Sequence, residues 1–168
     1  KLASRFHPCK DETVKQAFLF ACFCGLRISD VRTLRWADIG KGTEGYYISK
    51  LMVKTRHVLT VPLSENALSW MPARGQARAD NKVFELPSFF SVNYRLKQWA
   101  REAGIDKPVT FHVSRHTFAT TLLTMGVDLY TTSKLLGHQN IITTQVYAEI
   151  VNRKKVEAVN LLDQIKPL

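Results

Sequence analysis

The stretch FHVSRHTFATTLLTMGVDLYTTSKLLGHQNIITTQVY, residues 111–147, contains two expected helices and most of the reactive side chains of the chain. Apolar residues recur at helical spacing over residues 113–125, and Gly126 follows at the position of a helix C-cap. A shorter helix is expected over residues 131–136 and is ended by Gly137. This part of the chain is therefore expected to be helical.

The chain before this stretch also shows helical patterns, each starting at a residue that favours the N-cap position. The expected caps are Asp11, Ser29, Ser64 and Ser88 or Ser91. Gly25 ends the first of these helices and Gly104 the last. The last helix has a predicted buried stripe made of Val92, Leu96, Trp99, Ala100 and Ala103.

Strand-like residues lie between these helices. Residues 46–53 and 58–62 are rich in Tyr, Ile, Leu and Val, and residues 54–57 (KTRH) form the turn between them. Gly40, Gly42 and Gly45 mark a loop before the first strand. The sequence therefore predicts a mainly α fold with a small antiparallel β-sheet (α+β), organised as a single domain over residues 1–168.

The composition favours a polyanionic partner. The 24 Lys and Arg outnumber the 14 Asp and Glu, and the net charge is +10. Such a surplus indicates nucleic acid, although a basic domain without that partner would show the same charge. The longest apolar run, residues 17–24, is far shorter than the roughly 20 residues that span a bilayer, so no membrane partner is expected.

The three cysteines, Cys9, Cys22 and Cys24, are an odd number, which favours free thiols in a reducing, cytoplasmic compartment. With His7 they could form a zinc set, but the Cys-x-Cys spacing suits zinc poorly and Cys22 and Cys24 lie in an apolar run. Small apolar side chains are the preferred interpretation, and no metal site is expected.

Tyr147 is the candidate nucleophile. A phenol can attack a phosphodiester if its proton is removed and the charge of the phosphorane is stabilised. Arg27 and Arg115 are candidates for that stabilisation, because a guanidinium offers a planar fork of donors to phosphate oxygens. Asp30, three residues after Arg27, is expected to hold its guanidinium in place. Taken alone, Arg27 could be a surface arginine and Tyr147 a packed aromatic.

His112, His138 and Lys54 are candidates for proton transfer. An imidazole titrates near neutral pH, and a lysine at a hairpin tip could protonate a leaving 5′ oxygen. His116 is expected to form a hydrogen bond rather than react. Each of these residues also has a simpler structural interpretation, so the ordered set is more informative than any single member.

This ordered set resembles the catalytic domain of the tyrosine recombinases, the phage-integrase family. The resemblance covers residues 11–160 and rests on GLRISDVRTLRWADI, FHVSRHTFATTLLTMGV and KLLGHQNIITTQVYA, with a looser match at KTRHVLTVPLS. It assigns the six catalytic positions of the family to Arg27, Lys54, His112, Arg115, His138 and Tyr147. It also places at Asp30 the acidic residue that supports the first arginine.

The resemblance implies DNA strand cleavage and rejoining through a 3′-phosphotyrosyl link at Tyr147, without metal or ATP. It makes Lys54 the general acid and His112 the general base. The residues that would stabilise the phosphorane are Arg27, Arg115 and His138. The implied partner is double-stranded DNA, bound by a homo-oligomer, a tetramer, of the full-length protein.

The resemblance also implies a wider architecture. The amino-terminal DNA-binding domain of the family is expected to be absent from this chain, as in a fragment. The helix over residues 88–103 is expected to face DNA, with Arg95 and Lys97 as its contacts. The tail, residues 148–168, is expected to pack either on a neighbouring protomer or on its own domain. Its apolar face is formed by Val156, Val159 and Leu162.

Other functions fit parts of the pattern. A type IB topoisomerase shares the chemistry but rejoins the same strand. A non-catalytic DNA-binding fragment would explain the charge, though not the complete set of six residues. A metal-dependent phosphodiesterase fits poorly, because no acidic cluster accompanies His112 and His138.

Overall fold

The computed structural model describes residues 11–147 and 159–160. The chain falls into two compact units, residues 1–118 and residues 119–168. The expected tail contacts of Val156 and Leu162 lie outside the described residues. That the two units together form one catalytic domain stays a prediction.

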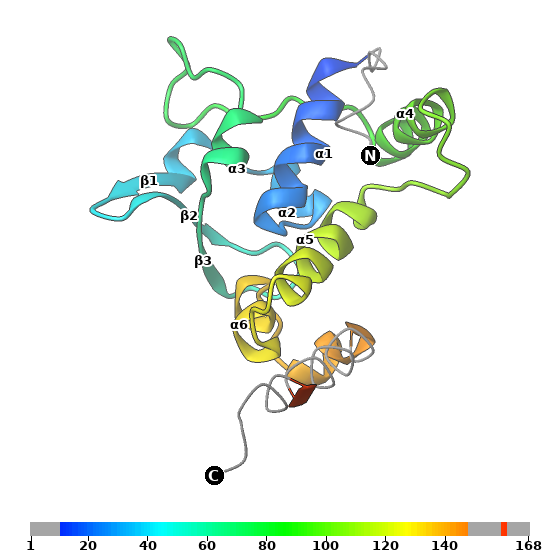
Figure 1. Ribbon diagram of the computed structural model, residues 1–168. Helices are drawn as coiled ribbons and strands as arrows, with labels where there is room; N and C mark the ends of the chain where they lie inside the picture. Colours follow the sequence, from blue (N-terminus) through cyan, green and yellow to red (C-terminus); the bar gives the residue numbers. More distant parts are fainter. Residues whose placement is uncertain (1–10, 148–158, 161–168) are drawn as a thin grey trace. The chain divides into compact units, whose positions relative to one another are not determined.

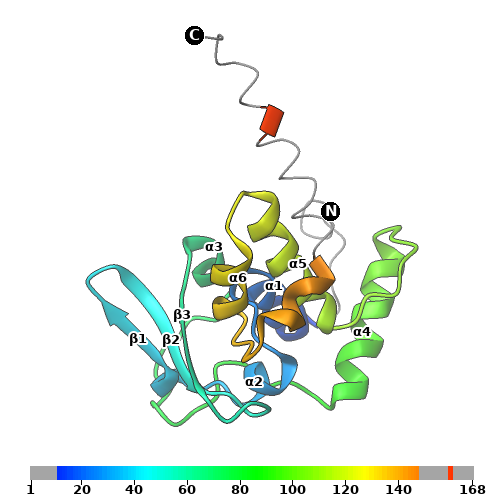
Figure 2. The same ribbon diagram turned by 90° about the horizontal axis from the view of Figure 1, so that it is seen from below.

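The first unit is built around helix α1 (Glu12–Cys24). Asp11 caps it as predicted, since its carboxylate accepts a hydrogen bond from the amide of Val14 at 3.0 Å. Gly25 ends the helix in the left-handed conformation, with a φ of 70°. Figures 1 and 2 both show α1 lying between the sheet and helix α4 (Phe89–Glu102), which explains why apolar side chains are buried around most of its circumference.

Helix α2 (Ile28–Arg32) follows at once, and the predicted cap at Ser29 is wrong. The N-cap residue is Arg27, whose carbonyl accepts hydrogen bonds from the amides of Asp30 and Val31. Only three residues separate α1 from α2, and Leu26 among them is buried, so the new helix starts earlier than the sequence suggested. The side chain of Arg27 makes no capping bond and is available for other contacts.

The strands form one antiparallel sheet of order β1-β2-β3 after a short 3₁₀ turn, η1 (Trp36–Asp38). They are β1 (Ile39–Gly42), β2 (Gly45–Leu51) and β3 (Val58–Pro62). The two predicted strands are confirmed. The loop predicted at Gly40 and Gly42 is wrong, because both residues lie in β1. A Cβ atom on Gly40 would come within 2.4 Å of the Tyr47 ring, so glycine here allows that ring to cover the strand.

Helices complete the first unit: α3 (Glu65–Ser69), α4, and the start of α5 (His112–Thr124). Ser64 and Ser88 cap α3 and α4 as predicted. The predicted stripe of α4 is buried in full. Its Trp99 packs edge-on against Phe18 of α1, with ring centroids 6.3 Å apart. The predicted mainly α fold with a small antiparallel sheet is therefore confirmed.

Helix α5 continues into the second unit, and Gly126 follows it with a φ of 94°. Helix α6 (Leu129–Leu135) starts two residues earlier than expected, because Asp128 accepts a hydrogen bond from the amide of Thr131 and acts as its N-cap. The 3₁₀ segment η2 (Ile141–Tyr147) packs against α6. The reactive residues of this unit thus lie on short segments that α6 supports.

The two described cysteines behave as apolar side chains. Cys22 and Cys24 are free, and burial raises the pKa of each to about 12, so both stay protonated at neutral pH. His7 and Cys9 lie outside the described residues. Within residues 11–147 and 159–160, no group of three or more potential metal ligands comes together. None of the helices described is both long and apolar enough to cross a bilayer.

Candidate active site

A pocket of about 620 Å³ in the first unit brings together four of the predicted catalytic residues. They are Arg27, Lys54, His112 and Arg115. Lys97 also lines the pocket, whereas no Asp or Glu among the described residues does. The pocket therefore presents concentrated positive charge, which favours an anionic ligand such as a phosphodiester.

Arg27 supplies the most specific feature of this pocket. Its Nη1 atom is buried and has no hydrogen-bond partner within the described part of the chain. Leaving a buried donor unsatisfied costs about 1–3 kcal/mol, and more for a charged group. Arg27 also lines the pocket, and a phosphate oxygen is an acceptor that suits the donors of a guanidinium.

A hydrogen bond to the end of α1 holds Arg115 in place. It is buried, with 4% of its surface exposed, and its Nη1 donates a hydrogen bond to the carbonyl of Gly25 at 2.6 Å. A Cβ atom on Gly25 would lie 2.5 Å from the Phe118 ring, which is on the same helix as Arg115. The absence of a side chain at Gly25 thus allows α5 to approach closely enough for this bond.

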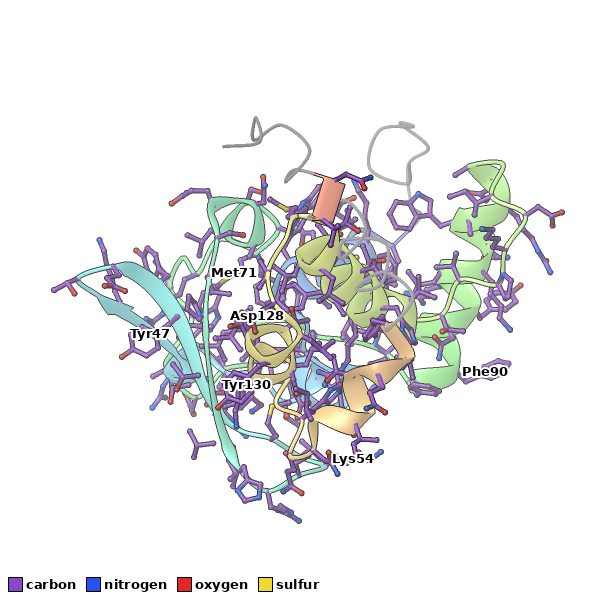
Figure 3. The ribbon with its side chains drawn as sticks, turned by 60° about the horizontal axis from the view of Figure 1, so that its bottom comes forward. Tyr47, Lys54, Met71, Phe90, Asp128 and Tyr130 are labelled. Carbon is purple, nitrogen blue, oxygen red and sulfur yellow. The ribbon has the colours of Figure 1, made fainter. Side chains whose placement is uncertain are left out.

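Lys54 lies on the loop between β2 and β3, and its side chain is exposed (Figure 3). The residue before it is fixed by Asp30, whose Oδ1 accepts a hydrogen bond from the amide of Val53 at 2.8 Å. The predicted contact between the side chains of Asp30 and Arg27 is not found: within the described residues neither a hydrogen bond nor an ion pair joins the carboxylate to the guanidinium. The fully buried carboxylate binds the loop between β2 and β3, so it positions the hairpin rather than the guanidinium.

His112 is the first residue of α5, and its environment keeps the imidazole neutral. Its pKa lies below the usual value of 6.5. Partial burial is the largest cause of the lowered pKa, followed by the electrostatic effect of His116 and the positive charges of Arg115, Arg27 and Lys54. The ring of His116 packs edge-on against it, with centroids 4.5 Å apart. A neutral imidazole at physiological pH can accept a proton, as a general base must.

Asn93 is a positioning residue that the sequence did not reveal. Its Oδ1 accepts a hydrogen bond from the amide of Phe111 at 2.8 Å, and its Nδ2 donates to the carbonyl of Phe89 at 3.1 Å. It thereby joins the first turn of α4 to the residue before His112. An Asn on a helix has no sequence signal for such a role, because the two elements that it joins meet only in the folded chain.

The two predicted DNA contacts on α4 are separated by the fold. Lys97 is exposed and lines the pocket with Arg27 and Lys54. Arg95 forms an ion pair with Asp11 and lines a different hollow, of about 430 Å³, on the other side of the helix. The geometry thus favours Lys97 over Arg95 as a contact to a ligand in the pocket.

His138 and Tyr147 belong to the second unit. His138 follows Gly137, which has a φ of 62°, and its Nδ1 shares a hydrogen bond with the hydroxyl of Thr144 at 2.9 Å. That bond fixes the ring, while the tautomer sets which atom donates. Tyr147 ends η2 and is 7% exposed. Attack by this phenol requires its hydroxyl to reach a phosphorus atom.

Residues 2–153 of the sequence match the family model described as "Phage integrase family". Tyrosine recombinase XerD of Proteus mirabilis is 34% identical over 167 residues, which cover 88% of this chain and 52% of that protein. A tyrosine recombinase of Pseudothermotoga lettingae is 33% identical over 148 residues, with 84% and 51% covered. The chain thus spans about half the length of these curated relatives.

Solved structures show the same fold. XerA recombinase has a TM-score of 0.67 at 22% identity, over 89% of this chain and 64% of that one. The catalytic domain of bacteriophage HP1 integrase has a TM-score of 0.61 at 25% identity, with 80% and 73% covered. XerH site-specific recombinase bound to its difH substrate has a TM-score of 0.63 at 18% identity, with 86% and 45% covered. Together with the match over most of its length, these similarities show that the chain belongs to the phage integrase family.

Proposed function

We propose that this chain is the catalytic part of a site-specific DNA recombinase, which cleaves and rejoins strands through a 3′-phosphotyrosyl intermediate. The observation that carries the proposal is the pocket lined by Arg27 and three further cations, Lys54, Lys97 and Arg115. This arrangement suits the charge and donor geometry of a phosphodiester. Family membership, and the solved structure of the Tn1549 transposon integrase in complex with DNA, support double-stranded DNA as the substrate.

In the proposed reaction the Tyr147 oxygen attacks the phosphorus and its proton passes to His112. The bond from phosphorus to the 5′ oxygen breaks, and Lys54 gives that oxygen a proton. The negative charge of the phosphorane would be stabilised by Arg27, Arg115 and His138. One phosphodiester is exchanged for another of similar energy, so the reverse attack by a 5′ hydroxyl can reseal a strand without ATP.

The buried state of Tyr147 adds a step to this proposal. Only 7% of the surface of this residue is exposed, so the proposed cleavage includes a change in the second unit that brings its hydroxyl to the phosphate. In the full-length protein we place this step in a homotetramer on DNA, in the cytoplasm of a bacterial cell. An assembly of that kind would couple exposure of the nucleophile to pairing of two sites.

The test is covalent trapping on nicked duplexes with randomised flanks, in which the short cleaved strand diffuses away and prevents resealing. Wild-type protein should stay attached to DNA after denaturation, and Tyr147→Phe should bind DNA but form no adduct. Tyr130→Phe is the matched control, because Tyr130 is exposed and lies on α6 of the same unit. An adduct that survives in Tyr147→Phe and disappears in Tyr130→Phe would disprove the assignment of the nucleophile.

The same assay separates the alternatives. Transfer of the trapped strand to a second duplex supports a recombinase. Relaxation of supercoiled DNA without such transfer would indicate a type IB topoisomerase-like activity. Binding without any adduct would leave a non-catalytic DNA-binding fragment.

A further inference from the structure

Two phenylalanines stand exposed at the start of α4. Phe89 and Phe90 keep 60% and 78% of their surface accessible, although burial of such side chains normally stabilises a protein. Figure 3 shows Phe90 projecting outward from the end of the helix. Exposed aromatic residues next to a charged pocket indicate a ligand with an apolar part as well as an anionic part.

Both rings line the pocket that contains Arg27 and Arg115. Phe90 also borders the hollow on the other side of α4, whereas Phe89 borders only the cationic pocket. A bound molecule whose phosphate reached Arg27 would therefore place its neighbouring groups against these rings.

The first turn of α4 is held in this position by polar contacts from two directions. Arg32 of α2 donates a hydrogen bond to the carbonyl of Pro87, just before the helix. Asn93 binds the carbonyl of Phe89 and the amide of Phe111. The exposed rings are thus anchored to the same elements that carry Arg27 and His112, rather than lying on a free loop.

DNA offers a group that matches this surface. The 5-methyl group of thymine is apolar and lies in the major groove, which admits the end of an α-helix. Phe89 and Phe90 are consecutive in a helix, so their side chains diverge by about 100° and cannot enclose one base between them. Two separate contacts to base edges fit this geometry better than a sandwich around an unstacked base.

We infer that Phe89 and Phe90 contact thymine methyl groups in the major groove beside the phosphate held in the pocket. They would give the protein a preference for thymine at positions flanking the scissile phosphate. The inference rests on the proposed function, because it assumes that DNA occupies this pocket. To the proposed function it adds two residues that recognise a base, Phe89 and Phe90, and it identifies that base as thymine.

The experiment compares two labelled duplexes of one mixed sequence, with thymine in the first and uracil at every thymine position in the second. Uracil keeps base pairing and removes only the methyl groups. By fluorescence anisotropy at low salt, wild-type protein should bind the thymine duplex more tightly, by about fourfold for each methyl group contacted (about 0.8 kcal/mol). Phe89→Ala and Phe90→Ala should lower this preference, and the double variant should abolish it.

Tyr94→Ala is the matched control. Tyr94 lies on the same helix and is 54% exposed, yet it borders only the other hollow. It should keep the wild-type preference for thymine. Because the replaced side chains are exposed, the thermal unfolding of all these variants should match that of wild type, which excludes misfolding as the cause.

Equal affinity of the wild-type protein for both duplexes would overturn the inference, as would an unchanged preference in the double Phe variant. A uniform loss of affinity for both duplexes in the Phe variants would mean stacking on base faces or sugars, and would also overturn it. These failures are distinguishable from failure of the proposed function. If only this inference fails, covalent trapping through Tyr147 still occurs. If the proposed function fails, the trapping is lost.

Discussion

The carboxylate of Asp30 accepts a hydrogen bond from the backbone amide of Val53 at 2.8 Å. The bond ties α2, which begins after Arg27, to the end of the strand that precedes Lys54. A second bond, from Lys50 to the carbonyl of Thr33 at 2.9 Å, fastens the same two elements. Arg27 and Lys54 therefore lie next to elements that these two hydrogen bonds hold together.

Asp30→Ala is expected to slow cleavage mainly by displacing Lys54. Loss of a hydrogen bond to a charged acceptor corresponds to about 1.5–3 kcal/mol, or roughly a 10- to 100-fold lower rate if it acts on the transition state. Asp30→Asn keeps an acceptor oxygen and should lose less. The measurement is the single-turnover rate on nicked DNA, alongside thermal unfolding.

The cause can be separated with a substrate whose leaving 5′ oxygen is replaced by sulfur. A thiolate leaves without a proton from Lys54, so this substrate should restore Asp30→Ala and Lys54→Ala but not Arg27→Ala. A defect of Asp30→Ala that persists on the sulfur substrate would show that Asp30 does not act through the lysine.

In a plot of cleavage rate against pH, the acidic limb, where the rate falls as pH is lowered, should lie below pH 6.5. The pKa of His112 is lowered, so the neutral, proton-accepting form persists as pH falls until the lowered pKa is reached. His116→Gln removes one of the charges that lower it, and should move the limb to higher pH. His57→Gln, on the hairpin, serves as the control and should leave the profile unchanged. A limb above pH 6.5 in wild-type protein would contradict the role of His112 as base.

Lys97→Ala should reduce the salt dependence of DNA binding. Each phosphate contact contributes about 0.9 to the slope of log affinity against log salt concentration, so one lost contact should lower the slope by about that amount. Arg95→Ala should leave the slope unchanged, because Arg95 is paired with Asp11 away from the pocket. Equal effects of the two substitutions would mean that DNA covers both sides of α4.

Gly25→Ala should destabilise the fold and weaken catalysis together. The new Cβ would lie 2.5 Å from the Phe118 ring and would disturb the bond from Arg115 to the Gly25 carbonyl. Overpacking of this kind costs about 1–3 kcal/mol, measurable as a lower Tm. Gly75→Ala is the control, since Gly75 also has a positive φ, 50°, but open space around it. Similar losses of Tm for both would show that backbone strain, not packing, is responsible.

The sequence by itself predicted most of the helices, the hairpin and a set of candidate reactive residues. The caps at Asp11, Ser64 and Ser88 depend on hydrogen bonds between residues three apart, and such contacts follow directly from local spacing. The buried stripe of α4 follows from helical periodicity in the same way. Where local pattern competed with the tight turn after Gly25, as at Ser29, the prediction was wrong.

Only the tertiary structure decided how those residues are held. The bond from Asp30 to Val53 joins residues 23 apart, and that from Arg115 to Gly25 joins residues 90 apart. Partners at such distances are selected by packing of whole elements, and no short spacing encodes them. Packing also separated Lys97 from Arg95 and left Nη1 of Arg27 buried without an acceptor among the described residues. The sequence thus supplied the candidate reactive groups, while packing of the first unit brought four of them to one pocket.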